Sequence, residues 1–156
     1  MGEGVRRREF MRTAALATGG LILAQAEAAR AFTGHAEVDA KLFESINRAK
    51  DPAHKVGLEV LHVPVVELPA NIKAGEPFAV QVAIGEKLHP MGPNHYIDWV
   101  EILAGNEPAG RLDFRERFSQ PKATFFITLD KPVTLVTRLY CNLHGLWESE
   151  QEIKLV

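Results

Sequence analysis

The chain has 156 residues, the size of one ordinary domain, and 46% of them are hydrophobic, which is enough to form a core. Its formal net charge is −2 and charged residues make up 24%, so no basic excess indicates a nucleic-acid partner. A single cysteine excludes an internal disulfide and any metal site built from four cysteines. A site for a soft metal would therefore combine this one sulfur with some of the six histidines.

Residues 1–31 have the pattern of an export signal rather than that of a folded segment. The run Arg6–Arg12 (RRREFMR) resembles a twin-arginine signal. The apolar run Thr13–Ala24 follows, and it is shorter than the roughly 20 apolar residues that a membrane span needs. Small residues up to position 31 offer cleavage points. We expect a periplasmic or otherwise exported protein that meets the membrane only during export.

Residues 32–55 form a predicted N-terminal arm. Between Ala36 and Ala49 the apolar residues have a spacing that suits either a short amphipathic helix or a loosely docked extended segment. The pair Asp51-Pro52 ends it, because the residue before a proline avoids helical dihedral angles. Two histidines in this arm, His35 and His54, are expected at the surface.

From residue 56 onwards the pattern becomes that of short strands separated by turn residues. The predicted strands are Val56–Leu68, Phe78–Ile84, His95–Ala104, Arg111–Phe118, Ala123–Leu129, Val133–Tyr140 and Leu146–Val156. About seven strands without a long helix between them predict an all-β fold, an antiparallel β-sandwich of immunoglobulin-like size over residues 56–156. A sandwich gathers its loops at its two ends, so loops distant in sequence can build one site.

The only cysteine belongs to the segment Cys141–His144 (CNLH), on a predicted tight loop after a strand. A thiolate and an imidazole three positions apart can reach one metal ion from both sides of a turn. Taken alone, the pair also suits a buried cysteine beside a loop histidine.

Three further histidines, His62, His89 and His95, lie at predicted strand ends or in loops marked by proline. With His144 they supply four imidazoles beside the one thiolate. Five donors exceed the tetrahedral four of structural zinc and suit ferrous iron or another redox-active metal with one position left open. Ferrous iron with one thiolate keeps a local charge of about +1, which would attract a small anion.

Five motifs in this order resemble the superoxide reductase family, the desulfoferrodoxin and neelaredoxin group. They are His62–Glu67 (HVPVVE), Lys73–Phe78 (KAGEPF), His89–Met91 (HPM), His95–Val100 (HYIDWV) and Cys141–Trp147 (CNLHGLW). The resemblance runs from about Leu42 to the C-terminus, and its first residues resemble the N-terminal extension of neelaredoxin-type members.

The resemblance implies an immunoglobulin-like sandwich with one non-haem iron, held by His62, His89, His95 and His144 in a plane and by Cys141 on the axis. It implies one-electron reduction of superoxide to hydrogen peroxide, with electrons from a small redox protein, and a homo-oligomeric assembly. The second, four-cysteine iron site of desulfoferrodoxins cannot form in a chain with one cysteine.

The chain departs from the family directly before the first histidine. Members usually carry Glu-Lys there, the lysine attracting superoxide, whereas this chain has Val60 and Leu61. Two other charged residues are weaker candidates for these tasks. Glu59 lies on a predicted alternating strand, which would point it away from the metal, and Lys87 precedes the loop of His89.

Two other interpretations stay open. A cupredoxin-like electron carrier also has an exported β-sandwich and a Tyr-Cys-x-x-His segment, which Tyr140–His144 matches. Its copper site wants two histidines and a weak axial ligand, yet no methionine follows His144, and His62 and His89 would be left over. A family member with an iron site but an altered role, as a sensor or a binder of small anions, is suggested by the missing Glu-Lys pair.

Overall fold

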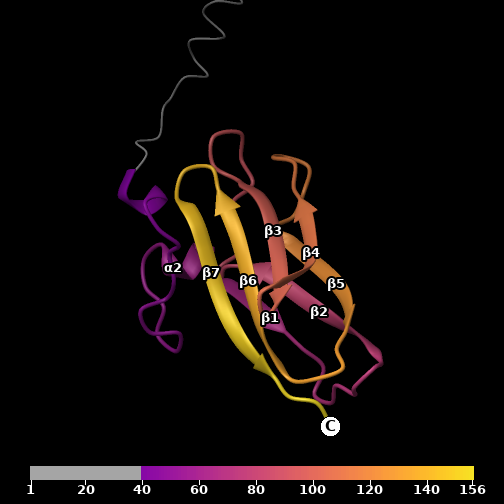
Figure 1. Ribbon diagram of the computed structural model, residues 1–156. Coiled ribbons are helices and arrows are strands. Elements are labelled where there is room, and N and C mark those ends of the chain that lie inside the picture. Colours follow the sequence, from indigo (N-terminus) through magenta and orange to yellow (C-terminus); the bar gives the residue numbers. More distant parts are fainter. Residues whose placement is uncertain (1–39) are drawn as a thin grey trace, which may run out of the picture. The chain divides into compact units, whose positions relative to one another are not determined.

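A computed structural model describes residues 40–156 of the chain (Figure 1). Two short helical turns come first, η1 (Ala40–Phe43) and α2 (Glu59–His62). Seven strands follow: β1 (Pro64–Glu67), β2 (Pro77–Ile84), β3 (Ile97–Ala104), β4 (Glu107–Asp113), β5 (Lys122–Thr128), β6 (Val133–Cys141) and β7 (Gly145–Ile153). The predicted export signal, residues 1–31, and the start of the predicted arm, residues 32–39, lie outside the described residues. No helix within residues 40–156 is both long enough and apolar enough to cross a membrane.

The strands form two antiparallel sheets, one in the order β1-β2-β5 and the other in the order β4-β3-β6-β7. Figure 1 shows the four-stranded sheet in front of the three-stranded one. The predicted antiparallel sandwich of about seven strands is therefore confirmed.

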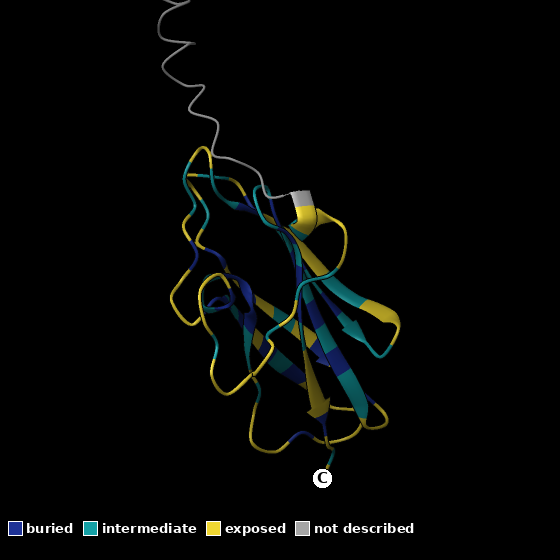
Figure 2. Ribbon diagram, turned by 90° about the vertical axis from the view of Figure 1, so that its left-hand side faces the viewer, coloured by how far each residue is buried: buried dark blue, intermediate teal, exposed yellow. Residues whose placement is uncertain are grey.

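The core lies between the sheets and follows from the alternation of side chains along each strand. In β2 the inward residues Phe78, Val80, Val82 and Ile84 are at most 8% exposed, whereas Gln81 faces solvent. In β6 the inward positions carry Leu135, Leu139 and finally the cysteine. Figure 2 shows the same alternation of buried and exposed positions along the strands. The strand register that fills the core thus places the Cys141 thiol inward at the end of β6.

The prediction of a strand beginning at Val56 is wrong. Residues 59–62 form the helical turn α2, in which the backbone N–H groups of His62 and Val63 donate to the carbonyls of Leu58 and Glu59 at 3.1 and 3.0 Å. Strand β1 begins only at Pro64. A short apolar run does not distinguish a helical turn from a strand, and this turn places His62 at 0% exposure.

Strand β4 also begins earlier than the predicted Arg111. It starts at Glu107, because Gly105 and Asn106 form a tight turn after which Ala104 pairs directly with Glu107. Proline 108 is tolerated in β4 because this strand lies at the edge of its sheet and the register shifts nearby at a bulge.

The β6–β7 hairpin turns within three residues, since Cys141 still pairs with Gly145. Gly145 adopts a φ of +69°, a conformation that residues with a side chain rarely take. In the described part of the predicted arm, Ala40–Phe43 form the helical turn η1, and Asn47 forms a parallel bridge with Trp147. The arm therefore lies against the hairpin that carries the cysteine.

Candidate metal centre

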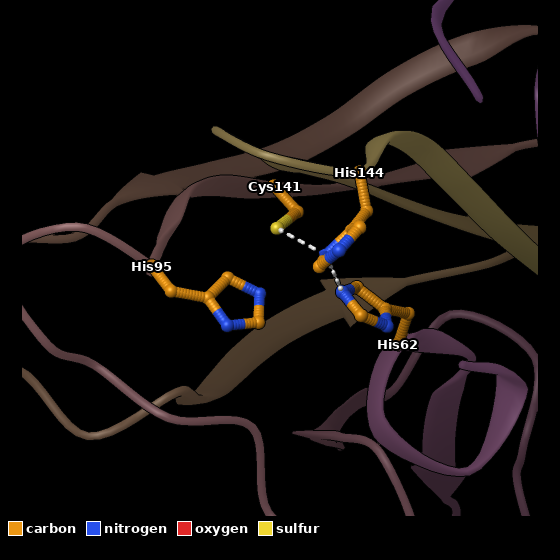
Figure 3. A group of neighbouring side chains, drawn as sticks. All are labelled: His62, His95, Cys141 and His144. Atoms are coloured by element: carbon orange, nitrogen blue, oxygen red, sulfur yellow. Dashed lines mark hydrogen bonds between the residues drawn. The ribbon is translucent and has the colours of Figure 1, made fainter. Parts of the chain in front are cut away.

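The four predicted histidines and the cysteine meet at the end of the sandwich where the β6–β7 hairpin turns. His62, His95, Cys141 and His144 each offer one ligand atom, and these atoms all lie within 4.8 Å of one another (Figure 3). His89 adjoins this group, with its Nε2 atom 3.1 Å from Nε2 of His62 and 3.7 Å from Sγ of Cys141. All five side chains that the sequence selected are brought together.

Different elements supply the five side chains. His62 ends α2, His89 lies in the loop after β2, and His95 lies just before β3. Cys141 is the last residue of β6, and His144 belongs to the turn that follows. The loop with His89 is anchored to the sheet, because the His89 backbone N–H donates to the Ile84 carbonyl at 3.0 Å. Sandwich topology is thus what gathers residues spread over 83 positions.

Hydrogen bonds fix the orientation of two of the rings. Nδ1 of His62 donates to the Leu58 carbonyl at 2.8 Å, and Nδ1 of His89 donates to the Pro90 carbonyl at 2.6 Å. Burial, and then the neighbouring histidines, lower the pKa of His62 to about 4 and that of His89 to about 3. Both rings are therefore neutral at pH 7, with the proton on Nδ1 and a lone pair on Nε2.

The lone pairs of this cluster need a cation. Nε2 of His62 and Nε2 of His89 face each other at 3.1 Å although neither carries a proton, so the contact is not a hydrogen bond. Nε2 of His95 is buried and has no hydrogen-bond partner among the described residues. Buried acceptors without donors are costly. A metal ion among them would satisfy these nitrogens at once, so the residues present fit a metal.

Cys141 completes the donor set as a free, fully buried thiol. Burial raises its pKa, while the backbone N–H groups of Leu143 and His144 act in the opposite direction. Sγ lies 3.6 Å from Nδ1 of His144. A metal ion would convert the thiol to the thiolate. Four imidazoles with one thiolate suit a redox-active metal such as iron better than the four-coordinate sites of structural zinc.

Comparison with known proteins identifies the group to which this centre belongs. Residues 49–150 match the family model described as Desulfoferrodoxin, which is more than half of the chain. The chain belongs to the desulfoferrodoxin family. A superoxide reductase of Pyrococcus horikoshii is 35% identical over 103 residues, which cover 60% of this chain and 87% of the relative. A superoxide reductase of Thermococcus kodakarensis is 34% identical over 99 residues, which cover 57% and 84%.

The fold agrees with that of solved members of the family. A superoxide reductase (neelaredoxin) from Ignicoccus hospitalis superposes with a TM-score of 0.62 at 32% identity, covering 77% of this chain and 100% of the other. The family that the sequence motifs predicted is therefore confirmed.

The structure gives the two weaker candidates different positions. The Glu59 carboxylate is buried and accepts the backbone N–H groups of Lys50 and Val56 at 3.3 and 3.2 Å, so it ties the arm to α2. Lys87 is exposed, and its backbone N–H donates to the Val60 carbonyl at 3.3 Å. The turn of Lys87 therefore lies against one of the two positions where the family usually has its Glu-Lys pair.

Two further residues contact the loops and rings of the centre. The Oδ1 of Asn142 accepts the Tyr96 N–H at 2.8 Å, and its Nδ2 donates to the Asn94 carbonyl at 3.0 Å. It thereby joins the turn after Cys141 to the segment of His95. Trp147 is buried and stacks on the His62 ring with centroids 4.9 Å apart.

One residue at the centre gave no sequence signal. Asn47 of the arm contacts the backbone of the β6–β7 hairpin, and these partners lie 97 and 99 positions away. An asparagine in an amphipathic stretch is ordinary, and neither spacing nor composition indicates a contact over such a separation.

Proposed function

We propose that this protein is an iron-dependent superoxide reductase, which reduces superoxide by one electron to hydrogen peroxide. The observation that carries the proposal is the cluster of four imidazoles and one thiol, in which unprotonated nitrogens face each other at 3.1 Å. Membership of the desulfoferrodoxin family supports it, since relatives 34–35% identical are superoxide reductases. We assign His62, His89, His95, Cys141 and His144 as the residues that would hold one iron ion.

The chain's own residues prepare the centre for this role. The carbonyls of Leu58 and Pro90 hold the Nδ1 protons of His62 and His89, so that both Nε2 lone pairs point inward without rearrangement. The N–H groups of Leu143 and His144 face the sulfur of Cys141 and favour its charged form. Bound ferrous iron would supply the single electron, and a small redox protein would restore it.

The five side chains of the centre differ in their exposure to solvent. His62, His89 and Cys141 are at most 2% exposed, whereas His95 and His144 are partly exposed. A small anion would therefore approach past His95 and His144. One superoxide, one electron and two protons give one hydrogen peroxide. We propose that the protons come from solvent on this side, because the nearby Glu59 carboxylate is engaged with backbone N–H groups.

Metal analysis and fast kinetics test the proposal. Purified protein should contain about one iron per chain, and the ferrous form should be oxidised by superoxide generated by pulse radiolysis, with one peroxide formed per superoxide and no dioxygen. His144→Ala serves as the matched variant with a broken donor set. A reaction no faster than spontaneous dismutation, with iron bound, would overturn the enzymatic assignment.

We propose Lys87 as the cation that attracts superoxide in place of the usual lysine. Support comes from its exposure and from the bond that joins its turn to Val60. A charge of this kind raises the association rate and makes it sensitive to ionic strength. Lys87→Ala should lower the rate at low salt and weaken its salt dependence, whereas Lys73→Ala, in a turn where Lys73 pairs with Glu76, should change neither.

Export and assembly complete the proposal. The pattern Arg6–Arg12 supports twin-arginine export to the periplasm, and the family resemblance supports a homo-oligomer. Cell fractionation tests the first point: Arg7→Lys with Arg8→Lys should leave the protein in the cytoplasm. Light scattering of the purified protein tests the second, and a monomeric mass would contradict it.

A further inference from the structure

The N-terminal arm makes backbone hydrogen bonds to the hairpin of residues 141–147, called here the metal hairpin because it carries two of the proposed ligands. The Asn47 backbone N–H donates to the Leu146 carbonyl at 2.8 Å, and the Asn47 carbonyl accepts the Glu148 N–H at 2.9 Å. These bonds make the arm a short parallel strand beside the start of β7. The arm is thus continuous with the sheet at the metal hairpin.

The side chain of Asn47 binds three backbone carbonyls. Its Nδ2 donates to Leu42 O at 2.9 Å and to Leu146 O at 2.8 Å, and reaches His144 O at 3.4 Å. All three partners are acceptors, so the side-chain group that contacts them must be a donor. One amide therefore joins the arm to the two residues that flank the glycine of the metal hairpin.

The carbonyl of His144 links this amide to two of the imidazoles. It also accepts the indole N–H of Trp147 at 2.9 Å, and the Trp147 ring stacks on His62 with an interplanar angle of 23°. Fixing the peptide after His144 therefore fixes the direction of the His144 side chain. It also fixes the ring that packs against His62.

The arm and the metal hairpin approach each other more closely than side chains allow. A Cβ added to Gly145 would lie 2.3 Å from the carbonyl oxygen of Leu42, and φ there is +69°. Only a glycine permits this packing. The contact is therefore part of the hairpin's conformation.

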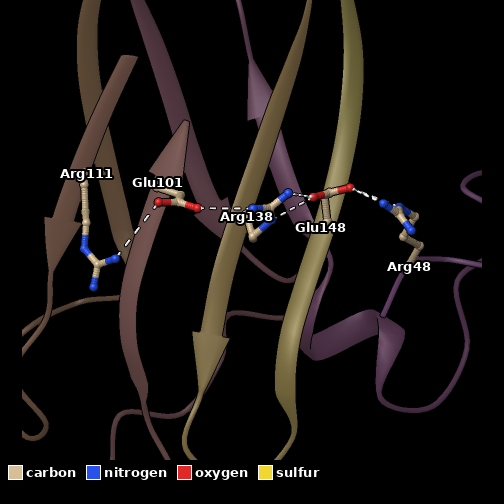
Figure 4. A network of polar contacts seen from close by, with 5 residues as sticks. All are labelled: Arg48, Glu101, Arg111, Arg138 and Glu148. Carbon is tan, nitrogen blue, oxygen red and sulfur yellow. Dashed lines mark hydrogen bonds and ion pairs between the residues drawn. The ribbon is translucent and has the colours of Figure 1, made fainter. Parts of the chain in front are cut away.

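A charged contact anchors the far end of the arm segment. Arg48 donates to the buried Glu148 carboxylate, whose other oxygen accepts from Arg138 of β6 at 2.7 and 2.8 Å (Figure 4). Glu148 is 2% exposed, so this anchor is largely shielded from solvent. The arm thus contacts the sheet at Leu42, which packs on Gly145, and at Arg48, which binds Glu148, and Asn47 lies next to Arg48.

We propose that Asn47 is a positioning residue of the metal centre, and that the arm segment Leu42–Arg48 clasps the metal hairpin so that His144 and Trp147 keep their places. The inference rests on the iron site proposed above. The family match begins at residue 49, so the clasp precedes the part of the chain that the family model covers.

Three substitutions of Asn47 test the clasp. Asn47→Ala removes the donor, Asn47→Asp keeps the shape but opposes the carbonyls with an acceptor, and Asn47→Ser keeps one donor. Residues that orient metal ligands typically change metal affinity about 10- to 100-fold. We expect iron release to a chelator to accelerate at least about tenfold in the Ala and Asp variants, and less in Ser. The matched control is Asn71→Asp, the same change at an exposed turn.

Two readouts separate positioning from mere structural support. The thiolate-to-ferric absorption band should shift or broaden in Asn47→Ala. The rate of iron release should fall in the order Asn47→Asp, Asn47→Ala, Asn47→Ser and wild type. Far-UV circular dichroism checks the fold of each variant. If the Ala and Asp variants do not fold, then the iron release rate and the absorption band of Asn47→Ser test the clasp. Wild-type release rates and an unchanged band in the folded variants would overturn the clasp and leave the proposed function standing. Wild-type protein that takes up no iron would overturn the proposed function itself.

Discussion

The Nε2 atoms of His62 and His89 lie 3.1 Å apart, and hydrogen bonds on the other side of each ring leave both without a proton. Two lone pairs thus face each other in a buried place, where Nδ1 of His144 lies 3.0 Å from Nε2 of His62 and Sγ of Cys141 lies 3.7 Å from Nε2 of His89. The Nε2 atoms of His62 and His89 are therefore already free of protons before a metal ion binds. A metal ion entering the cluster meets neutral imidazoles at His62 and His89, and the thiol of Cys141 has a proton to lose.

Iron binding should release about one proton per chain at pH 7. The pKa values of His62 and His89 are about 4 and about 3, so these rings are already deprotonated, whereas burial raises the pKa of the Cys141 thiol. Calorimetric titration with ferrous iron, in two buffers of different ionisation enthalpy, measures the number released. Cys141→Ser should reduce it to near zero, and release of two or more protons from the wild type would contradict the assignment.

The iron-free protein should lose stability as the pH falls from 7 towards 4. The folded-state pKa values of His62 and His89 lie below the ordinary 6.5, so between these values the unfolded chain binds more protons. The free energy of unfolding is thus at its full value above about pH 6.5. The lowered pKa of each ring should reduce it by about 2 kcal/mol at pH 5 relative to pH 7. Urea unfolding at the two pH values measures the difference. His89→Leu should remove about half of it, and an undiminished difference in this variant would contradict the prediction.

Much of this architecture could be predicted because its signals are local. In the segment 78–84 buried residues alternate with more exposed ones, as expected of a strand with one face against a core. The five donors could be selected because their motifs occur in a fixed order. The helical turn α2 could not be predicted, since its short apolar run suits a strand equally well.

The finer chemistry of the centre depends on long-range geometry. His144 faces the cluster with Nδ1, whereas His62 and His89 use Nε2 because the carbonyls of Leu58 and Pro90 hold their Nδ1 protons. The contact of Asn47 with Leu146 joins residues 99 positions apart. Neither the spacing of hydrophobic residues nor the composition predicts such contacts, because they arise only when the hairpin and the arm pack together.

The buried Glu148 should contribute more to stability than Glu101 in the same row of charges. Figure 4 shows this row crossing the four-stranded sheet, with Arg138 between the two carboxylates. Glu148 is 2% exposed and bound by two arginines, whereas Glu101 is 25% exposed. Glu148→Gln should cost about 2 kcal/mol, because charge-assisted bonds are lost in a buried place. Glu101→Gln should cost less than about 1 kcal/mol. Urea unfolding compares them, and equal costs would contradict the argument.

Gly85 should tolerate alanine far less well than Gly57, although both have positive φ angles of +82° and +57°. At Gly57 a Cβ meets nothing within 4 Å, so alanine adds only backbone strain of about 1–2 kcal/mol. At Gly85 it would lie 2.5 Å from the Leu61 carbonyl and 2.6 Å from the Lys87 carbonyl. Backbone must therefore move, which adds about 1–3 kcal/mol or more.

That movement would separate α2 from the turn that leads to His89. Because His62 ends α2, Gly85→Ala should weaken iron binding as well as the fold, whereas Gly57→Ala should leave iron binding unchanged. Thermal unfolding of the iron-free variants measures the first effect, and iron release to a chelator measures the second. If Gly85→Ala lowers stability but releases iron at the wild-type rate, then the close packing of Leu61 on this turn supports the fold alone and does not set the distance between the two histidines.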